Sequence, residues 1–318
     1  MKKVSELVNY RNLYKDKNWQ TVVKQFGSEI RDMSEFVEHI KENTDVDFSE
    51  IQNNLQKSKE TLRDTVNDYQ RCLEELTTLI KKSDRHLRDA SENLSKASLI
   101  DPPEHILKKI RDREKTHHEF TTELFNERCK SYSSWKHPGM HIRPGHASWT
   151  KSIVDLDPLY LVDTHWDLLE PVKNKFNEHY KSRLRFSVIS DIDNSIFENF
   201  PQNQFGLILA TEFFNQKSLT ILEKYCREIF ELLRPGGVFI FTFNDCDFSE
   251  SVKNAENMYD CYTPGDEVKN ILEKIDFEIV EKINLNGTLN WLEAKRPGDL
   301  TSLRAGQTLA QIKTRENN

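Results

Sequence analysis

The pattern of apolar and polar positions separates a long helical region from the rest of the chain. From Gln52 to Ala97, apolar residues recur at alternating intervals of three and four, and polar residues hold most other positions. One set of seam positions is Gln52, Lys59, Val66, Leu73, Ile80, Leu87 and Leu94, and the other is Leu55, Leu62, Tyr69, Leu76, Ser83, Ala90 and Ala97. A sustained period of 3.5 predicts a long helix with a narrow seam, which is typical of a left-handed coiled coil.

Upstream of this region the pattern changes to the wider stripe of an amphipathic helix. Apolar residues predict one helix over residues 4–14 and a second over residues 19–40. Gly27 is expected to interrupt the second helix.

Downstream, residues 101–104 read Asp-Pro-Pro-Glu, which ends one helix and starts another. Asp101 is the expected N-cap and Pro102 the first helical residue. The new helix is expected to run to about Lys130, although Arg113 falls on its apolar stripe. Two arrangements are compatible with this pattern: the new helix folds back on the heptad helix as a hairpin, or the heptad helix pairs with other copies of the chain. We expect an oligomer that also uses the hairpin.

From about residue 136, short apolar runs alternate with helical patterns, which predicts an α/β fold with a mainly parallel sheet. A strand at Met140, a turn at Gly145 and a helix precede a second strand that ends at Asp163. The later elements are a helix to Phe176, strands over 183–190, 205–210 and 238–243, helices over 219–233 and 266–275, and a hairpin of 277–285 and 288–295 around Asn286-Gly287.

The phrase Leu-Arg-Pro-Gly-Gly-Val at residues 233–238 stands before the last parallel strand. With the strand order before it, the sequence resembles the class I S-adenosylmethionine-dependent methyltransferases over residues 137–296, about half of the chain. The resemblance implies a seven-stranded Rossmann-like methyltransferase sheet that is closed by an antiparallel hairpin. It also implies S-adenosylmethionine as cofactor.

The resemblance also places the family's glycine-rich cofactor loop. The acid that usually ends the first strand falls on His141, and the three glycine positions fall on Arg143, Gly145 and Ala147. Ala147 is a mild change, whereas Arg143 brings a guanidinium to the place where the cofactor's methionyl part would lie. Arg143 either pairs with the cofactor's carboxylate or fills a vestigial pocket.

Two acids match the family's adenosine-binding positions. Asp163 is expected to accept both ribose hydroxyls, and its alternative role is to cap the next helix. Asp191 is expected at the adenine amino group with Ile192 packed on the ring, although the stretch after Asp191 could equally form a turn.

Catalytic groups in this fold lie after the strands, where Thr211 and Glu212 follow the fourth strand. Thr211 is expected at the cofactor, and Glu212 is the candidate base. The alternative for Glu212 is a solvated acid at a helix start. The family often has an acid at the position of Gly206, and this chain lacks it.

Composition limits the remaining possibilities. With 31% charged residues and a mean hydropathy of −0.71, the 318-residue chain is too polar for one compact globule. A net charge of −7 argues against non-specific nucleic-acid binding by the whole chain. Five cysteines without a Cys-x-x-Cys pair predict reduced thiols in a cytoplasmic protein. We expect no signal peptide, no membrane span and no metal site among the histidines at 137, 141 and 146.

These patterns predict four segments: N-terminal helices over 1–45, a coiled coil or helical hairpin over 46–135, a methyltransferase-like domain over 136–296, and a tail over 297–318. The leading prediction for function is methyl transfer to a small-molecule or glycan-type acceptor by a homo-oligomer. The alternative is a catalytically inactive protein that keeps the fold as a structural component, and a third possibility is a nucleotide-binding regulator. The acceptor has no motif that identifies it.

Overall fold

The chain is described here by a computed structural model that covers residues 18–43, 47–115, 119–285 and 289–300. It forms two compact units, residues 1–86 and 87–318. The predicted helix over 4–14, the Asn286-Gly287 turn and most of the tail lie outside the described residues. No helix among the described residues is long and apolar enough to cross a bilayer.

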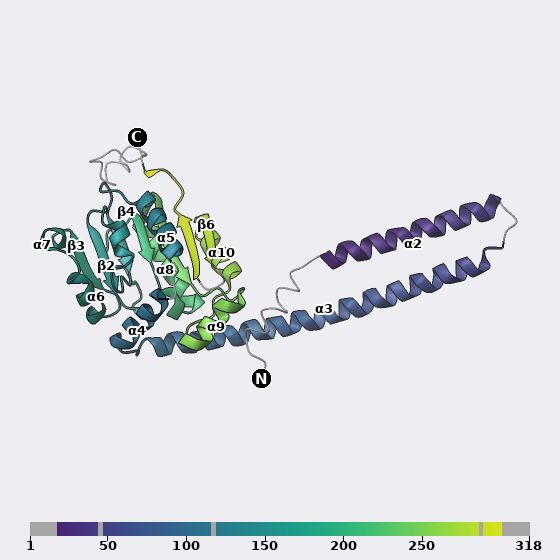
Figure 1. The fold of residues 1–318 in the computed structure, drawn as a ribbon, viewed down its shortest axis with the longest axis horizontal. Coiled ribbons are helices and arrows are strands. Elements are labelled where there is room, and N and C mark those ends of the chain that lie inside the picture. Colours follow the sequence, from purple (N-terminus) through teal and green to yellow (C-terminus); the bar gives the residue numbers. More distant parts are fainter. Residues whose placement is uncertain (1–17, 44–46, 116–118, 286–288, 301–318) are drawn as a thin grey trace. The chain divides into compact units, whose positions relative to one another are not determined.

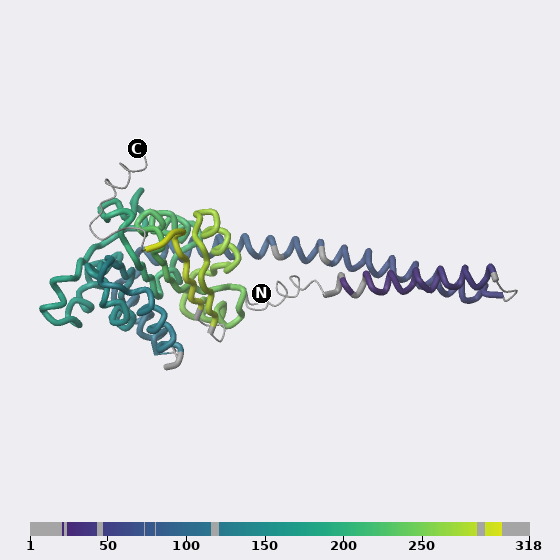
Figure 2. The backbone as a smooth tube through the Cα atoms, turned by 90° about the horizontal axis from the view of Figure 1, so that it is seen from above, coloured from purple at the N-terminus to yellow at the C-terminus, as the bar shows by residue number. Residues whose placement is uncertain are grey.

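The first unit holds α2 (Asn18–Asn43) and most of α3 (Ser49–Ser98). The long heptad helix is therefore confirmed as a helix. In this unit the two helices run antiparallel, side by side (Figures 1 and 2). The Gln52 side chain joins them by donating to Glu38 at 2.9 Å. The expected interruption at Gly27 is wrong, since the roughly 1 kcal/mol cost of a mid-helix glycine is outweighed by the apolar stripe on both sides of it.

The second unit is built on a seven-stranded sheet in the order β3-β2-β1-β4-β5-β7-β6. The strands are β1 (Gly139–Ile142), β2 (Leu159–Asp163), β3 (Leu184–Val188), β4 (Phe205–Ala210), β5 (Leu233–Phe243), β6 (Glu278–Leu285) and β7 (Leu289–Lys295). Strands β1 to β5 are parallel, and β7 runs antiparallel between β5 and β6. This is the arrangement of a methyltransferase-type sheet, so the predicted fold class is confirmed.

Helices cover both faces of this sheet because its buried strands are apolar on both sides. On one face Ile208 and Phe239 pack against α8 (Leu219–Leu232) and α10 (Gly265–Lys274). On the other face Leu207 and Ile240 pack against α5 (Glu119–Tyr132) and α6 (Trp166–Lys173). The short elements are α7 (Glu178–Lys181), α9 (Ser249–Met258) and two 3-10 turns, η1 (Thr150–Ile153) and η2 (Phe214–Gln216).

The region after α3 differs from the expectation in three ways. The single helix expected to reach Lys130 is two helices, α4 (Pro103–Glu114) and α5. The N-cap is Pro102 rather than Asp101, and it has no side-chain cap bond. The helices pack on the sheet unit rather than back on α3, because Ile110 of α4 meets Leu168 of α6 and Phe125 of α5 stacks on Trp291 of β7 at 4.0 Å. The helix expected after Gly145 is only the turn η1.

Candidate functional site

The candidate site lies at the carboxyl ends of the parallel strands, where the strand order reverses between β1 and β4. Open α/β sheets bind their ligands at such a switch point. Arg143 directly follows β1, Asp163 ends β2, and Glu212 lies two residues after β4. These candidate residues therefore lie at one edge of the sheet, as the sequence predicted.

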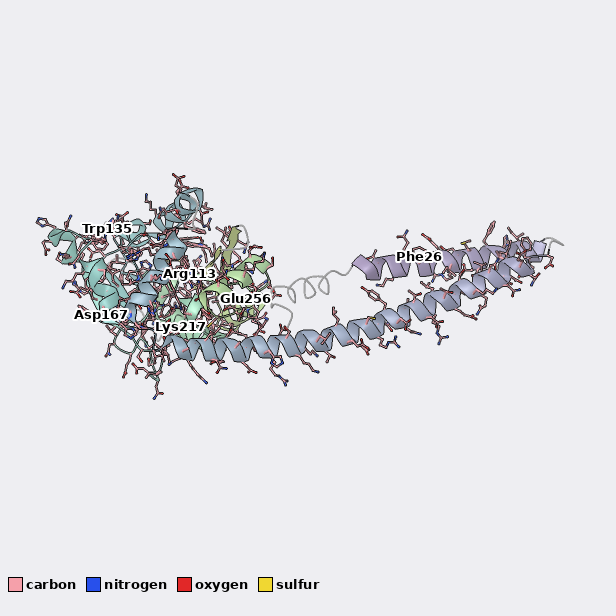
Figure 3. The ribbon with its side chains drawn as sticks, turned by 60° about the horizontal axis from the view of Figure 1, so that its bottom comes forward. Phe26, Arg113, Trp135, Asp167, Lys217 and Glu256 are labelled. Carbon is pink, nitrogen blue, oxygen red and sulfur yellow. The ribbon has the colours of Figure 1, made fainter. Side chains whose placement is uncertain are left out.

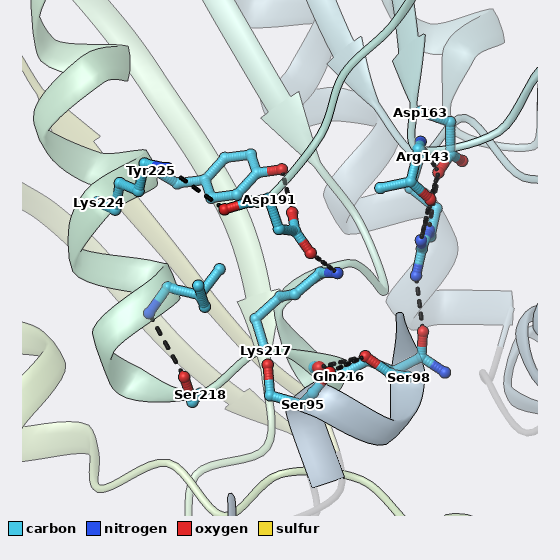
Figure 4. Close-up of polar contacts among 12 residues, drawn as sticks. Ser95, Ser98, Arg143, Asp163, Asp191, Gln216, Lys217, Ser218, Lys224 and Tyr225 are labelled. Carbon is cyan, nitrogen blue, oxygen red and sulfur yellow. Dashed lines mark hydrogen bonds and ion pairs between the residues drawn. The ribbon is translucent and has the colours of Figure 1, made fainter. Parts of the chain in front are cut away.

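Arg143 is buried and lies over this edge rather than pointing into solvent (Figure 4). Its Nη2 donates to Asp163 Oδ1 at 3.2 Å, and its Nη1 donates to Gln216 Oε1 at 2.7 Å. The guanidinium also stacks over Phe213, with Cζ 4.9 Å from the ring centre. A charged, planar group bound on three sides is held firmly in place.

Asp163 is the partner of Arg143, and it is not a helix cap. The next helix, α6, begins at Trp166 with His165 as its N-cap. Asp163 Oδ1 accepts from Arg143 and from the backbone N–H of Thr164 at 2.7 Å. Its second oxygen, Oδ2, is buried with no hydrogen-bond partner. One half of this carboxylate is therefore bound by the chain itself, and the other half is not.

Asp191 is bound on both oxygens by side chains of the same unit (Figure 4). Lys217 forms an ion pair with Oδ2, and the Tyr225 hydroxyl donates to Oδ1 at 2.6 Å. Burial lowers the pKa of Lys217 although Asp191 counteracts it, and the nearby Arg143 lowers it further. Ile192, expected against an adenine ring, is 78% exposed.

Glu212 is buried, so its alternative as a solvated helix-start acid is wrong. Its Oε2 accepts from Arg113 Nη1 at 2.9 Å and from Asn215 Nδ2 at 2.7 Å. Arg113 also forms an ion pair with Asp260. Burial opposes the charge of Arg113, but Asp260 and Glu212 together raise its pKa. Burial raises the pKa of Asp260 although Arg113 opposes this, and the nearby charge of Glu212 raises it further.

His141 and Thr211 complete the buried network. The His141 ring lies 2.9 Å from the Thr150 hydroxyl through Nδ1 and 3.0 Å from the Thr211 hydroxyl through Nε2. Burial lowers the pKa of His141 to about 3, so the imidazole is neutral at pH 7. The Thr211 hydroxyl is thus engaged by His141.

The loop after β1 keeps the backbone shape that glycine allows. Arg143, Gly145 and Ala147, the three family glycine positions, have φ values of 58°, 56° and 66°. A non-glycine residue in this left-handed region costs about 1–2 kcal/mol. At Gly145 an added Cβ would lie 3.0 Å from Cγ2 of Ile110 in α4. The loop conformation is therefore retained, while two of its glycines are replaced and α4 covers it.

The C-terminal end of α3 covers the neighbouring part of the edge. The Ser98 hydroxyl donates to the backbone oxygen of Gln216 at 3.2 Å, and the Ser91 hydroxyl donates to the backbone oxygen of Tyr262 at 3.0 Å. The cavity that remains between Ser98, His165 and Lys217 has a volume of about 170 Å³. Pockets for drug-sized ligands and cofactors measure about 300–1,000 Å³. This cavity is too small for S-adenosylmethionine, and the unpaired Asp163 Oδ2 is not part of its lining.

Sequence reasoning missed Lys217, Gln216 and Arg113, which hold the predicted acids. The signal for Arg113 was its place on the apolar stripe of a helix. A signal for Lys217 was also present, since it follows Phe213-Phe214-Asn215-Gln216 in the loop after a buried strand. Among the described residues, no three His, Cys, Asp or Glu side chains gather as a metal site.

Comparisons with known proteins return the fold without a close relative. No protein-family model matches the sequence, and no curated protein matches it. Solved structures match at low identity. An O-methyltransferase family protein from Burkholderia thailandensis is 11% identical with a TM-score of 0.43, over 56% of this chain and 55% of that chain. The YcgJ protein from Bacillus subtilis is 12% identical with a TM-score of 0.45, over 57% of this chain and 100% of that chain.

A third match is phosphoethanolamine N-methyltransferase 2 from Haemonchus contortus, determined with phosphomonomethylethanolamine and S-adenosylhomocysteine. It is 15% identical with a TM-score of 0.40, over 52% of this chain and 49% of that chain. The matched region thus spans about half the length of the Burkholderia and Haemonchus proteins. The class of fold rests on the order and direction of the seven strands, which are those of the class I methyltransferases.

Proposed function

We propose that this chain is a catalytically inactive protein of the methyltransferase fold, which serves as a structural component of an assembly. One observation carries the proposal. The two carboxylates at the family's cofactor-binding positions, Asp163 and Asp191, are already paired with Arg143 and Lys217 of the same unit.

The energies of these contacts favour the closed arrangement. Removing one partner from a buried ion pair costs about 3–5 kcal/mol because a charge is left uncompensated. A hydrogen bond to a charged group contributes only about 1.5–3 kcal/mol. Two such bonds from the ribose hydroxyls to Asp163, about 3–6 kcal/mol together, would only balance the displacement of Arg143 and leave little net gain for the cofactor. Glu212, the candidate base, is held in the same way by Arg113 and Asn215.

A second candidate function is S-adenosylmethionine-dependent methyl transfer to a small-molecule or glycan-type acceptor. It is favoured by the unpaired Asp163 Oδ2 and by the left-handed backbone of the cofactor loop. In this candidate Arg143 leaves Asp163 and pairs with the carboxylate of the cofactor's methionyl part. Ile192 then packs on the adenine only after its loop closes, and Thr211 and Glu212 exchange their present partners.

Calorimetric titration with S-adenosylmethionine and S-adenosylhomocysteine separates the two candidates through Arg143. If Arg143 fills the site, the native chain gives no binding heat, and Arg143→Gly creates or improves binding because the loop opens. If Arg143 clamps the carboxylate, the native chain binds, Arg143→Lys binds less well, and Arg143→Gly loses binding. Arg185→Gly, in the exposed part of β3, is the control for a general effect of removing an arginine.

A further inference from the structure

The inference concerns the first unit and rests on the assembly role in the proposed function. Along α3, one residue in every seven forms a row that flanks the heptad seam. This row is uncharged and exposed for its whole length, and it consists of Ile51, Ser58, Thr65, Cys72 and Leu79. In two-stranded coiled coils the rows beside the seam are often charged. A seam widened by one uncharged row is typical of a helix in a bundle of more than two helices.

Helix α2 also has more apolar surface than α3 covers. Val37 is only 9% exposed, whereas Met33 and Phe36 are 57% and 63% exposed. Phe26, two turns before Met33, is 54% exposed (Figure 3). A single antiparallel partner helix therefore buries one flank of this stripe and leaves the other flank in water.

The exposed flanks of α2 and α3 lie on the same side of the helical pair. A groove of about 300 Å³, here called the basic groove, marks the opposite side, and its lining includes Arg31, Lys59 and Arg63 together with apolar residues. Successive helical residues are about 100° apart, so Phe36 lies about 140° from Arg31, and Thr65 lies about 160° from Arg63. Both exposed flanks thus point away from the basic groove. We call their shared surface the open face, formed by the row from Ile51 to Leu79 with Phe26, Met33 and Phe36.

We propose that the open face is the interface between two copies of this chain, which pack their helical pairs together as a four-helix bundle. A two-fold interface places the same patch against itself, so a charged patch would repel its own copy. No residue of the open face carries a charge. Glu29, which lies between Phe26 and Met33 on α2, is bonded to Gln25 at 3.2 Å.

The polar members of the row can also be covered without an unpaired donor. The Ser58 hydroxyl donates to the Asn54 carbonyl at 2.9 Å, and the Thr65 hydroxyl donates to the Thr61 carbonyl at 2.7 Å. Both hydroxyl donors are therefore paired inside the helix, so burial against an apolar surface leaves no donor without a hydrogen bond.

The size of the open face is also that of a stable dimer. The row from Ile51 to Leu79 extends for about 42 Å at 1.5 Å per residue, and two adjacent helices are about 20 Å wide. The product, about 800 Å² on each copy, is an upper bound on the buried area, and it reaches the area that each partner buries in a standard interface. Lysine and arginine on the other side of the pair suit solvent rather than a second copy.

Sedimentation of the full chain, with substitutions on the open face, tests the proposal. The native chain should sediment as a dimer, and Phe36→Glu with Leu79→Glu should halve the mass. Both side chains are exposed in the single chain, so circular dichroism should not change. Thr78→Glu is the matched control, since Thr78 is exposed beside Leu79 but off the open face, and its dimer should persist. A monomeric native chain, or a dimer that survives both substitutions, overturns the proposal.

Labelling of Cys72 gives a second readout that does not depend on mass. Cys72 is exposed in the single chain, whereas the other four cysteines are buried. Its reaction with a maleimide should be slow in the dimer, and it should become faster on dilution or in the Leu79→Glu variant. A rate that is independent of concentration contradicts the proposed interface. Neither measurement involves the cofactor site. The proposed dimer can therefore be refuted without refuting the closed cofactor site, and the reverse also holds.

Discussion

Arg113→Met should destabilise the second unit, because it leaves two buried acids without their shared cation. Arg113 lies between Glu212 and Asp260, and all three are buried. Methionine keeps much of the side chain's volume and removes the charge. Breaking a buried ion pair in this way costs about 3–5 kcal/mol. In a domain of 150–250 residues, about 2–4 °C of melting temperature is lost per kcal/mol, so the expected fall is roughly 6–20 °C.

The loss should shrink in acid. Burial already raises the pKa of Asp260, and removing Arg113 removes a group that lowers it. The folded state then holds a proton that the unfolded state has lost, at every pH between the unfolded pKa and the raised one. Stability therefore falls as pH rises through that window, and it returns on acidification. Differential scanning calorimetry at about pH 7 and about pH 5 should show a smaller deficit at the lower pH.

Two further variants sharpen this test. Arg111→Met removes an exposed arginine two residues earlier in α4 and should change the melting temperature little. Arg113→Met combined with Asp260→Asn removes one charge of each sign and should recover part of the loss. A melting temperature of Arg113→Met equal to that of Arg111→Met, or a deficit that grows in acid, would refute the reasoning.

The strands could be predicted because local patterns specify them, whereas the seven-stranded sheet that they form was implied by the resemblance to the class I methyltransferases. Runs such as 205–210 are apolar on both faces and end at polar residues. Helix α8 is preceded by its N-cap Ser218, whose side chain accepts from Ile221 N–H. The division between α4 and α5 could not be predicted, since no glycine or proline marks it. Tertiary packing decides it, because Ile110 packs on α6 whereas Phe125 packs on β7.

The location of the candidate site could be predicted from the sequence, but the contacts between its side chains could not. Asp163 and Glu212 follow strands, so topology brings them to one edge. Arg113 and Glu212 are 99 positions apart, and no local pattern connects them. Whether Arg143 pairs with the cofactor's carboxylate or fills the pocket depends on its contacts with Gln216 and Phe213. Only the folded chain defines the positions of these two residues.

Three more outcomes are expected. Asp163→Ala should destabilise the second unit by about 3–5 kcal/mol in chemical denaturation, because Arg143 stays buried without its carboxylate; an unchanged midpoint would show that Gln216 alone suffices. Gly145→Ala should cost about 1–2 kcal/mol, since φ is +56° and the new Cβ meets Ile110. Hydrogen bonds from Arg128, Trp291 and Tyr132 lower the pKa of Glu293 although burial opposes this. The stability that Glu293 contributes is therefore present above its unfolded pKa near 4.5 and is lost as pH falls through the folded pKa. In Glu293→Gln the free energy of unfolding should therefore fall less steeply on acidification than in the native chain.

The central claim is that Arg143 and Lys217 close the cofactor site, and the melting temperature of the native chain in excess S-adenosylhomocysteine tests it directly. A ligand present at 100 times its dissociation constant stabilises the folded state by about 2.7 kcal/mol, which is roughly 5–11 °C for a unit of this size. We predict no shift for the native chain at about 1 mM ligand, which is 100 times a dissociation constant of about 10 μM. A rise of several degrees, abolished by Asp163→Ala, would contradict the account.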